Sequence, residues 1–338
     1  MVNIRYVVVV LCAVWLAGCA ATSGRFEVAL VGDQQYGAES EAQFPALMAD
    51  LDRADVSFVV HIGDFKAGAS PCDDSVFQDR LTTFEASRHP FILTPGDNDW
   101  TDCHLSKVRP YEPVERLNKL REIFFADNQS LGRRKIGLER QSADPRFAAY
   151  RENARWRQGG VMFATLHIVG SNNNLGRTAE QDREYRERME ANLAWLKDTF
   201  AVARREGSRG VALFTQANPR FEFVFPKGRI ASMRLSQPDA NSGFAPLWSV
   251  LEAEVLAYGR PVMFLHGDTH YFRVDKPLFR SDRAADGANR GRQIENFKRV
   301  EVHGFPEAHW VRLTVDPGDP AIFSVREVIV EANRFPAK

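Results

Sequence analysis

The sequence predicts an α/β protein in which two mixed β-sheets pack as a sandwich and helices cover both outer faces, a four-layer α/β/β/α arrangement. Three observations support this fold class. Four apolar runs end in Gly-Asp, which is typical of buried strands in a largely parallel sheet. Amphipathic stretches of helical length separate these runs. Toward the C-terminus, apolar and polar residues alternate as they do in antiparallel strands.

The N-terminal half predicts three successive strand–helix units. Asp33, Asp64 and Asp97 recur at intervals of about thirty residues, the length of a βαβ unit. The first strand is followed by no Gly-x-Gly-x-x-Gly, and the chain has no Walker lysine motif, so neither nucleotide-binding motif is present. The expected elements are a strand at 26–31, a helix at 42–54, a strand at 58–62, a helix at 74–86, a strand at 91–94 and a helix at 113–125.

The second half is less regular. An arginine-rich segment at 132–157 leads to a hairpin at Gly159-Gly160. The fourth Gly-Asp strand ends at Asp268. The other expected elements are strands at 161–169 and 210–214, helices at 178–205 and 244–258, and antiparallel strands at 300–302, 310–315 and 322–330.

The first residues predict an export signal with no part in the fold. One arginine precedes an apolar run, and Leu16-Ala17-Gly18-Cys19 has the form of a bacterial lipobox. We therefore expect a signal peptide at 1–18, a lipidated tether at 19–24 that begins at Cys19, and one domain at 25–338. An ordinary cleaved signal or an uncleaved membrane anchor are the alternatives.

The cysteines follow from that compartment. If Cys12 leaves with the signal and Cys19 carries lipid, only Cys72 and Cys103 remain, in loops that leave the same sheet edge. Because the cell envelope is oxidising, we expect a disulfide between them. Two free buried thiols, or thiolate metal ligands, are the alternatives.

Composition excludes some partners. The 338 residues carry a formal net charge of zero, so a bulk interaction with nucleic acid or with an anionic membrane surface is not expected. The chain has no Gly-x-Ser-x-Gly motif for a serine hydrolase. Composition sets no oligomeric state.

The carboxylates at the strand ends predict a cation site. In open α/β sheets, ligands bind at the carboxyl ends of the strands, which is where each Gly-Asp falls. Several carboxylates gathered together repel one another strongly unless a cation lies among them. We therefore expect metal binding at this edge.

In order and spacing, these motifs resemble the five sequence blocks of the calcineurin-like metallophosphoesterase superfamily, over essentially the whole mature chain. The blocks correspond here to Asp33-Gln34-Gln35, Gly63-Asp64, Gly96-Asp97-Asn98-Asp99, Gln216 and Gly267-Asp268-Thr269-His270. The resemblance implies that fold and two divalent metal ions, with a bridging hydroxide that attacks phosphorus. It implies that one ion is held by Asp33, Gln35, Asp64 and His270, and the other by Asp64, Asp97, Gln216 and Asp268.

The chain departs from the family at several of these positions. Gln35, Asp97, Gln216 and Asp268 stand where the family has histidine or asparagine. Oxygen donors favour Mn²⁺, Mg²⁺ or Ca²⁺, with Zn²⁺ or Fe possible. The expected catalytic residues are Asp64, Asn98 and Asp99. Asn98 replaces a family histidine, and an asparagine donates hydrogen bonds but delivers no proton.

Each of these residues also has a structural interpretation. Asp33, Asp64 and Asp97 would suit helix caps, Gln35 and Gln216 ordinary loop amides, and Asn98 a tight turn. His61 and His167 are expected in the core. His266 is a spare ligand candidate, and His104 is a candidate for the missing acid. The arginine-rich segments at 132–157 and 273–292 are candidate phosphate contacts.

These observations predict a metal-dependent phosphoric ester hydrolase that acts on a phosphate monoester, diester or anhydride. It would be a lipid-anchored, periplasm-facing lipoprotein of the cell envelope, with the outer membrane favoured by Ala20 after the lipobox cysteine. The alternative is a catalytically weak or inactive lipoprotein of the same fold that serves as a binding or scaffold module. Loss of most family histidines supports this alternative, and retention of Asp33, Asp64 and His270 counts against it.

Overall fold

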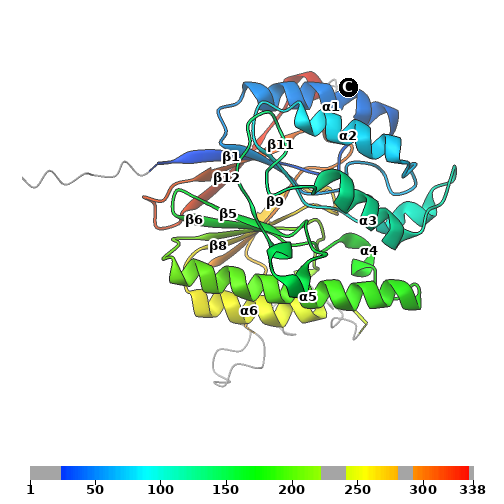
Figure 1. Cartoon of the computed structure of the whole chain (residues 1–338). Helices are drawn as coiled ribbons and strands as arrows, with labels where there is room; N and C mark the ends of the chain where they lie inside the picture. The colour runs from blue at the N-terminus through cyan, green and yellow to red at the C-terminus, as the bar shows by residue number, and fades with distance from the viewer. Residues whose placement is uncertain (1–23, 222–240, 281–291, 335–338) are drawn as a thin grey trace, which may run out of the picture.

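The computed structural model describes residues 24–221, 241–280 and 292–334, which form an α/β structure with two mixed sheets (Figure 1). This confirms the predicted α/β sandwich. The predicted signal peptide and Cys19 lie outside the described residues. Among the described residues, no helix combines the length and the apolar character that crossing a membrane requires.

The first sheet has the strand order β12-β11-β1-β2-β3. β1, β2 and β3 are parallel, as the Gly-Asp spacing predicts, whereas β11 and β12 are antiparallel to their neighbours. The bounds are β1 Phe26–Val31, β2 Phe58–His61, β3 Phe91–Leu93, β11 Trp310–Val315 and β12 Phe323–Val328.

The second sheet has the order β4-β5-β6-β7-β8-β10-β9. Its central strands β6, β7, β8 and β10 are parallel. The hairpin between β5 and β6 turns at Gly159-Gly160, where both φ angles are positive, as predicted. The bounds are β4 Glu139–Arg140, β5 Ala154–Gln158, β6 Val161–Thr165, β7 Val211–Phe214, β8 Val262–His266, β9 Arg273–Asp275 and β10 Phe297–Glu301.

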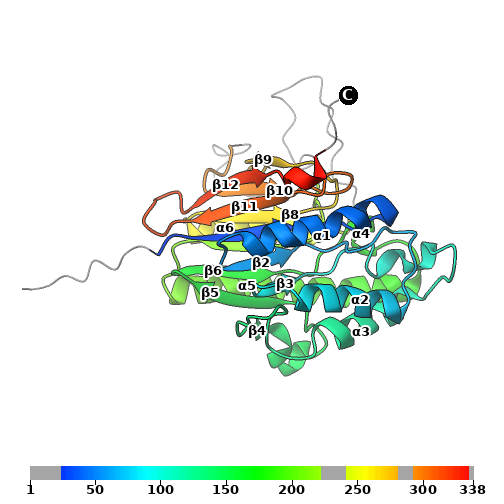
Figure 2. The same ribbon diagram turned by 90° about the horizontal axis from the view of Figure 1, so that it is seen from above.

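Helices lie on both sides of the two sheets, with α1 and α2 on one side and α5 and α6 on the other (Figures 1 and 2). Their bounds are α1 Gly37–Arg53, α2 Asp74–Glu85, α3 Pro113–Phe124, α4 Gly170–Asn173, α5 Ala179–Arg205 and α6 Ala245–Tyr258. Short 3-10 turns occur at Thr101–Leu105, Gln141–Ala143, Pro145–Phe147 and Glu331–Asn333.

Three large apolar cores, and a small cluster of Trp100, Leu117 and Val169, hold the described elements together. The central core packs Val28 and Val60 of the first sheet against Phe163 and Phe214 of the second. One outer core joins α5 and α6 to the second sheet, and the other joins α1, α2 and α3 to the first sheet. Because strands β1, β2, β3, β7 and β8 are buried on both faces, their sequences are continuous apolar runs.

Some element boundaries differ from the sequence-based predictions. The first helix begins at Gly37, five residues before the expected start at 42. The strand expected at 161–169 ends at Thr165, after which the chain leaves the sheet toward α4. The strand expected as antiparallel at 300–302 belongs to β10, which is antiparallel to β9 but parallel to β8. Long-range pairing decided its direction, and the alternation of residue types carries no information about that.

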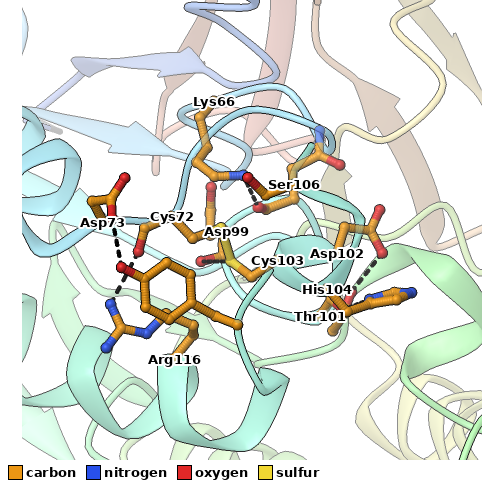
Figure 3. The surroundings of a disulfide bond; sticks show 12 residues. Lys66, Cys72, Asp73, Asp99, Thr101, Asp102, Cys103, His104, Ser106 and Arg116 are labelled. Atoms are coloured by element: carbon orange, nitrogen blue, oxygen red, sulfur yellow. Dashed lines mark hydrogen bonds between the residues drawn. A yellow bond between two sulfur atoms is a disulfide. The ribbon is translucent and has the colours of Figure 1, made fainter. Parts of the chain in front are cut away.

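The predicted disulfide is confirmed. Cys72 and Cys103 are bonded, with a Cα–Cα distance of 5.7 Å, and both residues are fully buried. Figure 3 shows Lys66, Asp99 and Asp102 around the bridge. Arg116 of α3 donates a 3.0 Å hydrogen bond to the Cys72 carbonyl. The bridge therefore ties the loop after β2 to the loop after β3.

Candidate functional site

The four Gly-Asp carboxylates converge on one edge of the molecule, although they come from both sheets. Asp33, Asp64 and Asp97 follow β1, β2 and β3 of the first sheet, and Asp268 follows β8 of the second. A backbone hydrogen bond joins the loop after β1 to the loop after β2, since Asp33 N donates to the Gly63 carbonyl at 3.0 Å. Asp268 N donates to both Asp33 carboxylate oxygens, at 3.1 and 3.2 Å, and so links the two sheets.

Glycines make room for these carboxylates. A Cβ on Gly96 would lie 1.9 Å from Asp64 Oδ1, and a Cβ on Gly267 would lie 2.0 Å from Asp33 Oδ2. A Cβ on Gly170, at the start of α4, would lie within 3 Å of carboxylate oxygens of both Asp97 and Asp268. These two carboxylates therefore face a common point. At Gly96 and Gly267 the backbone approaches a carboxylate so closely that only glycine fits, which local sequence reasoning cannot show.

The backbone of the site is strained. Asp33, Asp64, Asp268 and His270 all have positive φ angles, between 52° and 82°, where residues other than glycine are uncommon. Four consecutive residues from Ser171 to Asn174 also have positive φ. Strained conformations of this kind persist only where the surrounding contacts enforce them, and they cluster at functional sites.

Burial and mutual repulsion raise the pKa values of the carboxylates. Burial is the largest cause for all four, and the next is the charge of a neighbouring carboxylate. The pKa values of Asp33 and Asp64 are raised well above their ordinary value, Asp33 by Asp268 and Asp64 by Asp97. Burial and Asp102 raise the pKa of Asp97 to about 6, and burial and Asp97 raise that of Asp268 to about 7. The cluster therefore favours either protons or a bound cation.

His270 presents one ring nitrogen to this cluster. Its Nδ1 donates a 2.8 Å hydrogen bond to the Phe305 carbonyl, and its Nε2 lies 3.8 Å from Asp33 Oδ1. Burial lowers the pKa of His270, so the ring is neutral and Nε2 carries a lone pair. A carbonyl that orients an imidazole in this way is the usual outer partner of a metal-binding histidine.

The donor chemistry of the cluster fits a hard divalent cation. Among the described residues, no three His, Cys, Asp or Glu side chains stand in the geometry of a preformed metal site. Even so, Asp97 Oδ1 is buried without a hydrogen-bond partner, and His270 Nε2 faces Asp33 with a lone pair. Oxygen-rich donors of this kind suit Mg²⁺, Mn²⁺ or Ca²⁺. The role of these residues as ligands stays a prediction.

The three predicted catalytic residues lie together. Asn98 N donates to Asp64 Oδ1 at 2.9 Å. The Asp99 carboxylate accepts hydrogen bonds from the backbone N–H groups of Asp64, Phe65 and Gly96, at 3.0, 2.9 and 2.7 Å. Asp99 thus clamps the loop after β2 to the loop after β3, and it positions Asp64. The catalytic roles of Asp64, Asn98 and Asp99 stay a prediction.

The two predicted glutamine ligands occupy different places. Gln216 Nε2 donates to Asp64 Oδ2 at 3.2 Å, and its Oε1 accepts from Gly170 N at 2.7 Å, so both ends of the amide contact the site. Gln35 lines a cavity of about 520 Å³ between α1 and α2. No hydrogen bond joins its side chain to the four carboxylates within the described part of the chain, and its Oε1 is buried without a partner.

The structural alternatives for the aspartates can be checked directly. The N-cap residues of α1, α2 and α3 are Tyr36, Asp73 and Glu112, so Asp33, Asp64 and Asp97 do not cap these helices.

The other histidines lie as follows. His61 and His167 are fully buried, as expected of core histidines. His266 is buried, with its Nδ1 bonded to the Gly267 carbonyl. His104 is exposed, and its Nδ1 donates to the Thr101 carbonyl at 2.8 Å.

The structure adds three residues that sequence reasoning missed. Tyr36 donates its hydroxyl hydrogen to Asp64 Oδ2 at 2.9 Å. Ser171 donates to Asp97 Oδ2 at 2.8 Å. Glu301, fully buried in β10, accepts a 3.0 Å hydrogen bond from the backbone of Thr269, beside Asp268. Glu301 lies between Val300 and Val302, but β10 also carries Lys298 and Arg299, so the sequence carries no clear signal for it.

The arginine-rich segments mostly bind protein groups. Arg155 pairs with Glu139 and Asp198, and Arg157 pairs with Glu206. In the second segment, Arg273 lies 2.7 Å from Glu301, whereas Arg283 and Arg290 lie outside the described residues. Phosphate contact by these segments stays a prediction.

Comparison with known proteins assigns no family. No family model matches the sequence, and no curated protein matches it. One solved structure can be superposed on 91% of this chain and 100% of its own chain, with a TM-score of 0.40 and 9% sequence identity.

Proposed function

We propose that this protein is a metal-dependent phosphoesterase that hydrolyses a phosphate monoester, diester or anhydride. The four-layer arrangement of a calcineurin-like metallophosphoesterase, with two divalent ions at the strand ends, is part of this proposal. One observation carries it: four buried carboxylates from two different sheets converge with the lone pair of His270 on one edge. Burial of so many ionisable side chains costs free energy unless they are paired with other charges, so core packing alone does not account for them.

Under this proposal, some residues of the site are metal ligands and others hold those ligands in place. The ligands would be Asp33, Asp64, Asp97, Asp268 and His270, with Gln216 beside Asp64. Divalent ions bound there would neutralise the carboxylates and polarise the phosphoryl oxygens of the substrate. Asp99 holds the Asp64 loop, the Phe305 carbonyl orients His270, and Glu301 holds the backbone next to Asp268.

A second function has its own support. The Gln216 amide is occupied by Gly170 and Asp64, and Gln35 lines the cavity between α1 and α2. The Gln216 amide is thus already bonded to protein groups within the site, and Gln35 lies away from the four carboxylates, which favours an inactive protein of the same fold that binds a phosphorylated ligand or a structural ion. A metal assay combined with a hydrolysis assay separates this alternative from the enzyme.

The proposed location is the cell envelope, with a lipid on Cys19 and the domain facing the periplasm, most simply at the outer membrane. Mass spectrometry of the mature N-terminus tests the lipid, and the C19S variant is expected to move from the membrane fraction to the soluble fraction.

The experiment that tests the proposed function measures bound metal and the hydrolysis of aryl phosphate monoesters and diesters with Mn²⁺, Mg²⁺ or Ca²⁺ added. Asp64→Asn is expected to abolish both metal binding and turnover, because Asp64 lies at the centre of the cluster. Asp55→Asn, at an exposed position after α1, is the matched control and should leave both unchanged. Turnover that survives in Asp64→Asn refutes the enzyme, and bound metal without turnover selects the binding protein.

A further inference from the structure

Asn98 is held on three sides at the edge of the carboxylate cluster. Its backbone N–H donates to Asp64 Oδ1 at 2.9 Å, and its carbonyl accepts a 2.6 Å hydrogen bond from Lys66 Nζ. Its side-chain nitrogen donates to the Tyr36 hydroxyl at 2.8 Å. The side-chain oxygen lies toward Gly68, where a Cβ would approach it to 2.9 Å. The residue itself is only partly buried, so a ligand at the cluster can reach it.

Tyr36 fixes the amide of Asn98. The tyrosine hydroxyl accepts a hydrogen bond from Asn98 and donates one to Asp64 Oδ2 at 2.9 Å. The Tyr36 ring stacks on Phe305 at 5.9 Å between centroids and meets the His270 ring edge-on at 5.2 Å. The phenol therefore has no hydrogen left to offer a substrate. The Asn98 amide has two N–H groups, of which Tyr36 takes one.

Three described side chains near the cluster that carry a hydrogen on nitrogen or oxygen, those of His270, Ser171 and Lys66, are already engaged. His270 Nδ1–H is bonded to the Phe305 carbonyl, and the Ser171 hydroxyl is bonded to Asp97. Lys66 is 1% exposed, and its ammonium group is bonded to the Ala67 and Asn98 carbonyls, so it cannot reach a leaving group. None of these three described groups is free to protonate a departing oxygen.

We propose that Asn98, positioned by Tyr36, donates a hydrogen bond from its second side-chain N–H to a phosphoryl oxygen of the substrate and transfers no proton. The substrates are therefore phosphate esters of acidic alcohols, or phosphoanhydrides, whose leaving groups need no proton. This inference rests on the proposed phosphoesterase function and specifies its substrate class. In the reaction, a water oxygen forms the new bond to phosphorus while the bond from phosphorus to the leaving oxygen breaks. The leaving oxygen keeps the electron pair and departs as an anion, and the proton of the water goes to the solvent.

The test is a leaving-group series of aryl phosphates with phenols of graded pKa, together with one alkyl phosphate, on the metal-loaded protein. The wild type is expected to hydrolyse 4-nitrophenyl phosphate at least ~10²-fold faster than the alkyl phosphate, because no positioned acid assists the poor leaving group. Asn98→His introduces a ring that can carry a proton. It should narrow the gap between the hydrolysis rates of the aryl and the alkyl phosphate by ~10-fold or more. Asn98→Gln is the matched control, because it keeps the amide, and it should leave the gap wide.

Tyr36 has a separate readout. Tyr36→Phe removes the hydroxyl that anchors the Asn98 amide, so inorganic phosphate should bind about 10-fold more weakly by calorimetry, as expected for the loss of one hydrogen bond. The gap between leaving groups should stay as wide as in the wild type. Bound metal, measured by mass spectrometry, should be unchanged in Asn98→His, Asn98→Gln and Tyr36→Phe.

The outcomes separate this inference from the proposed function. Turnover with a shallow dependence on leaving-group pKa in the wild type overturns the inference and leaves the phosphoesterase in place. A folded, metal-loaded Asn98→His protein with an unchanged gap also overturns it. Failure to hydrolyse any of these esters, and also inorganic pyrophosphate as a phosphoanhydride, refutes the proposed function, and the inference falls with it.

Discussion

Replacing Asp97 by asparagine is expected to stabilise the cation-free protein at neutral and alkaline pH. Burial and the charge of Asp102 raise the pKa of Asp97 from 3.8 to about 6, and Asp97 itself raises the pKa values of Asp64 and Asp268. Asparagine has nearly the same shape and keeps an oxygen that can accept from Ser171. The substitution therefore removes a repelling charge with little change in packing.

The magnitude follows from the difference in pKa. A pKa of about 6 in the folded state, against 3.8 in the unfolded state, corresponds to about 3 kcal/mol of destabilisation once Asp97 is ionised. The folded state holds the Asp97 proton more tightly than the unfolded state does. The stability of the wild type is therefore full below the unfolded pKa of Asp97, 3.8, and is lost as pH rises through its folded pKa of about 6. The gain from Asp97→Asn should be largest above pH 6. For a chain of this length, Tm should rise by about 4 °C.

The assay is thermal unfolding in a chelator at pH 5 and at pH 8. The gain in Tm should be larger at pH 8, and added Mn²⁺ or Mg²⁺ should then raise the Tm of the wild type more than that of the variant. Asp55→Asn, at an exposed position after α1, is the matched control, and its Tm should equal that of the wild type at both pH values. A Tm of Asp97→Asn at or below that of the wild type at pH 8 refutes the reasoning.

Three further predictions concern the scaffold. Replacing Cys72 and Cys103 by serine should lower the free energy of unfolding by about 3–4 kcal/mol, because the bridge closes a loop with a sequence separation of 31; an unchanged denaturant midpoint would contradict this. Glu152→Gln should lower the free energy of unfolding by about 3 kcal/mol, because buried Glu152 neutralises Arg121. This pairing holds the pKa of Glu152 below its ordinary value despite burial. That stabilisation is present above the unfolded pKa and disappears as pH falls, so wild type and variant should converge in acid denaturation. Glu301→Gln should reduce bound metal with only a small change in Tm, because Glu301 holds the loop beside Asp268. Faster hydrogen exchange at 267–271 in the variant would show that this loop is the part that loosens.

Much of the fold could be predicted from the sequence because its signals are local. Continuous apolar runs form strands that are buried on both faces, and the Gly-Asp dipeptides mark where those strands end. Helices α2 and α3 begin at the predicted residues, since Asp74 and Pro113 suit the first turn of a helix. The Gly159-Gly160 turn was equally predictable, because glycine accepts positive φ.

The direction of β10 was a different case. Its residues predict a strand, but its parallel pairing with β8 depends on a partner more than thirty residues earlier in the chain. Strand pairing is decided by the packing of whole elements, so a residue pattern within one segment does not determine it.

The sequence by itself determined that carboxylates stand at four strand ends and that two cysteines lie in loops at the same edge. Only the tertiary structure decided which side chains share the site: Gln35 lines the cavity between α1 and α2, while Tyr36, the next residue, bonds to Asp64. Glu301 joins from β10. The physical reason is that the direction of a loop side chain depends on backbone angles, here left-handed at many site residues, and on contacts with segments far away in the sequence.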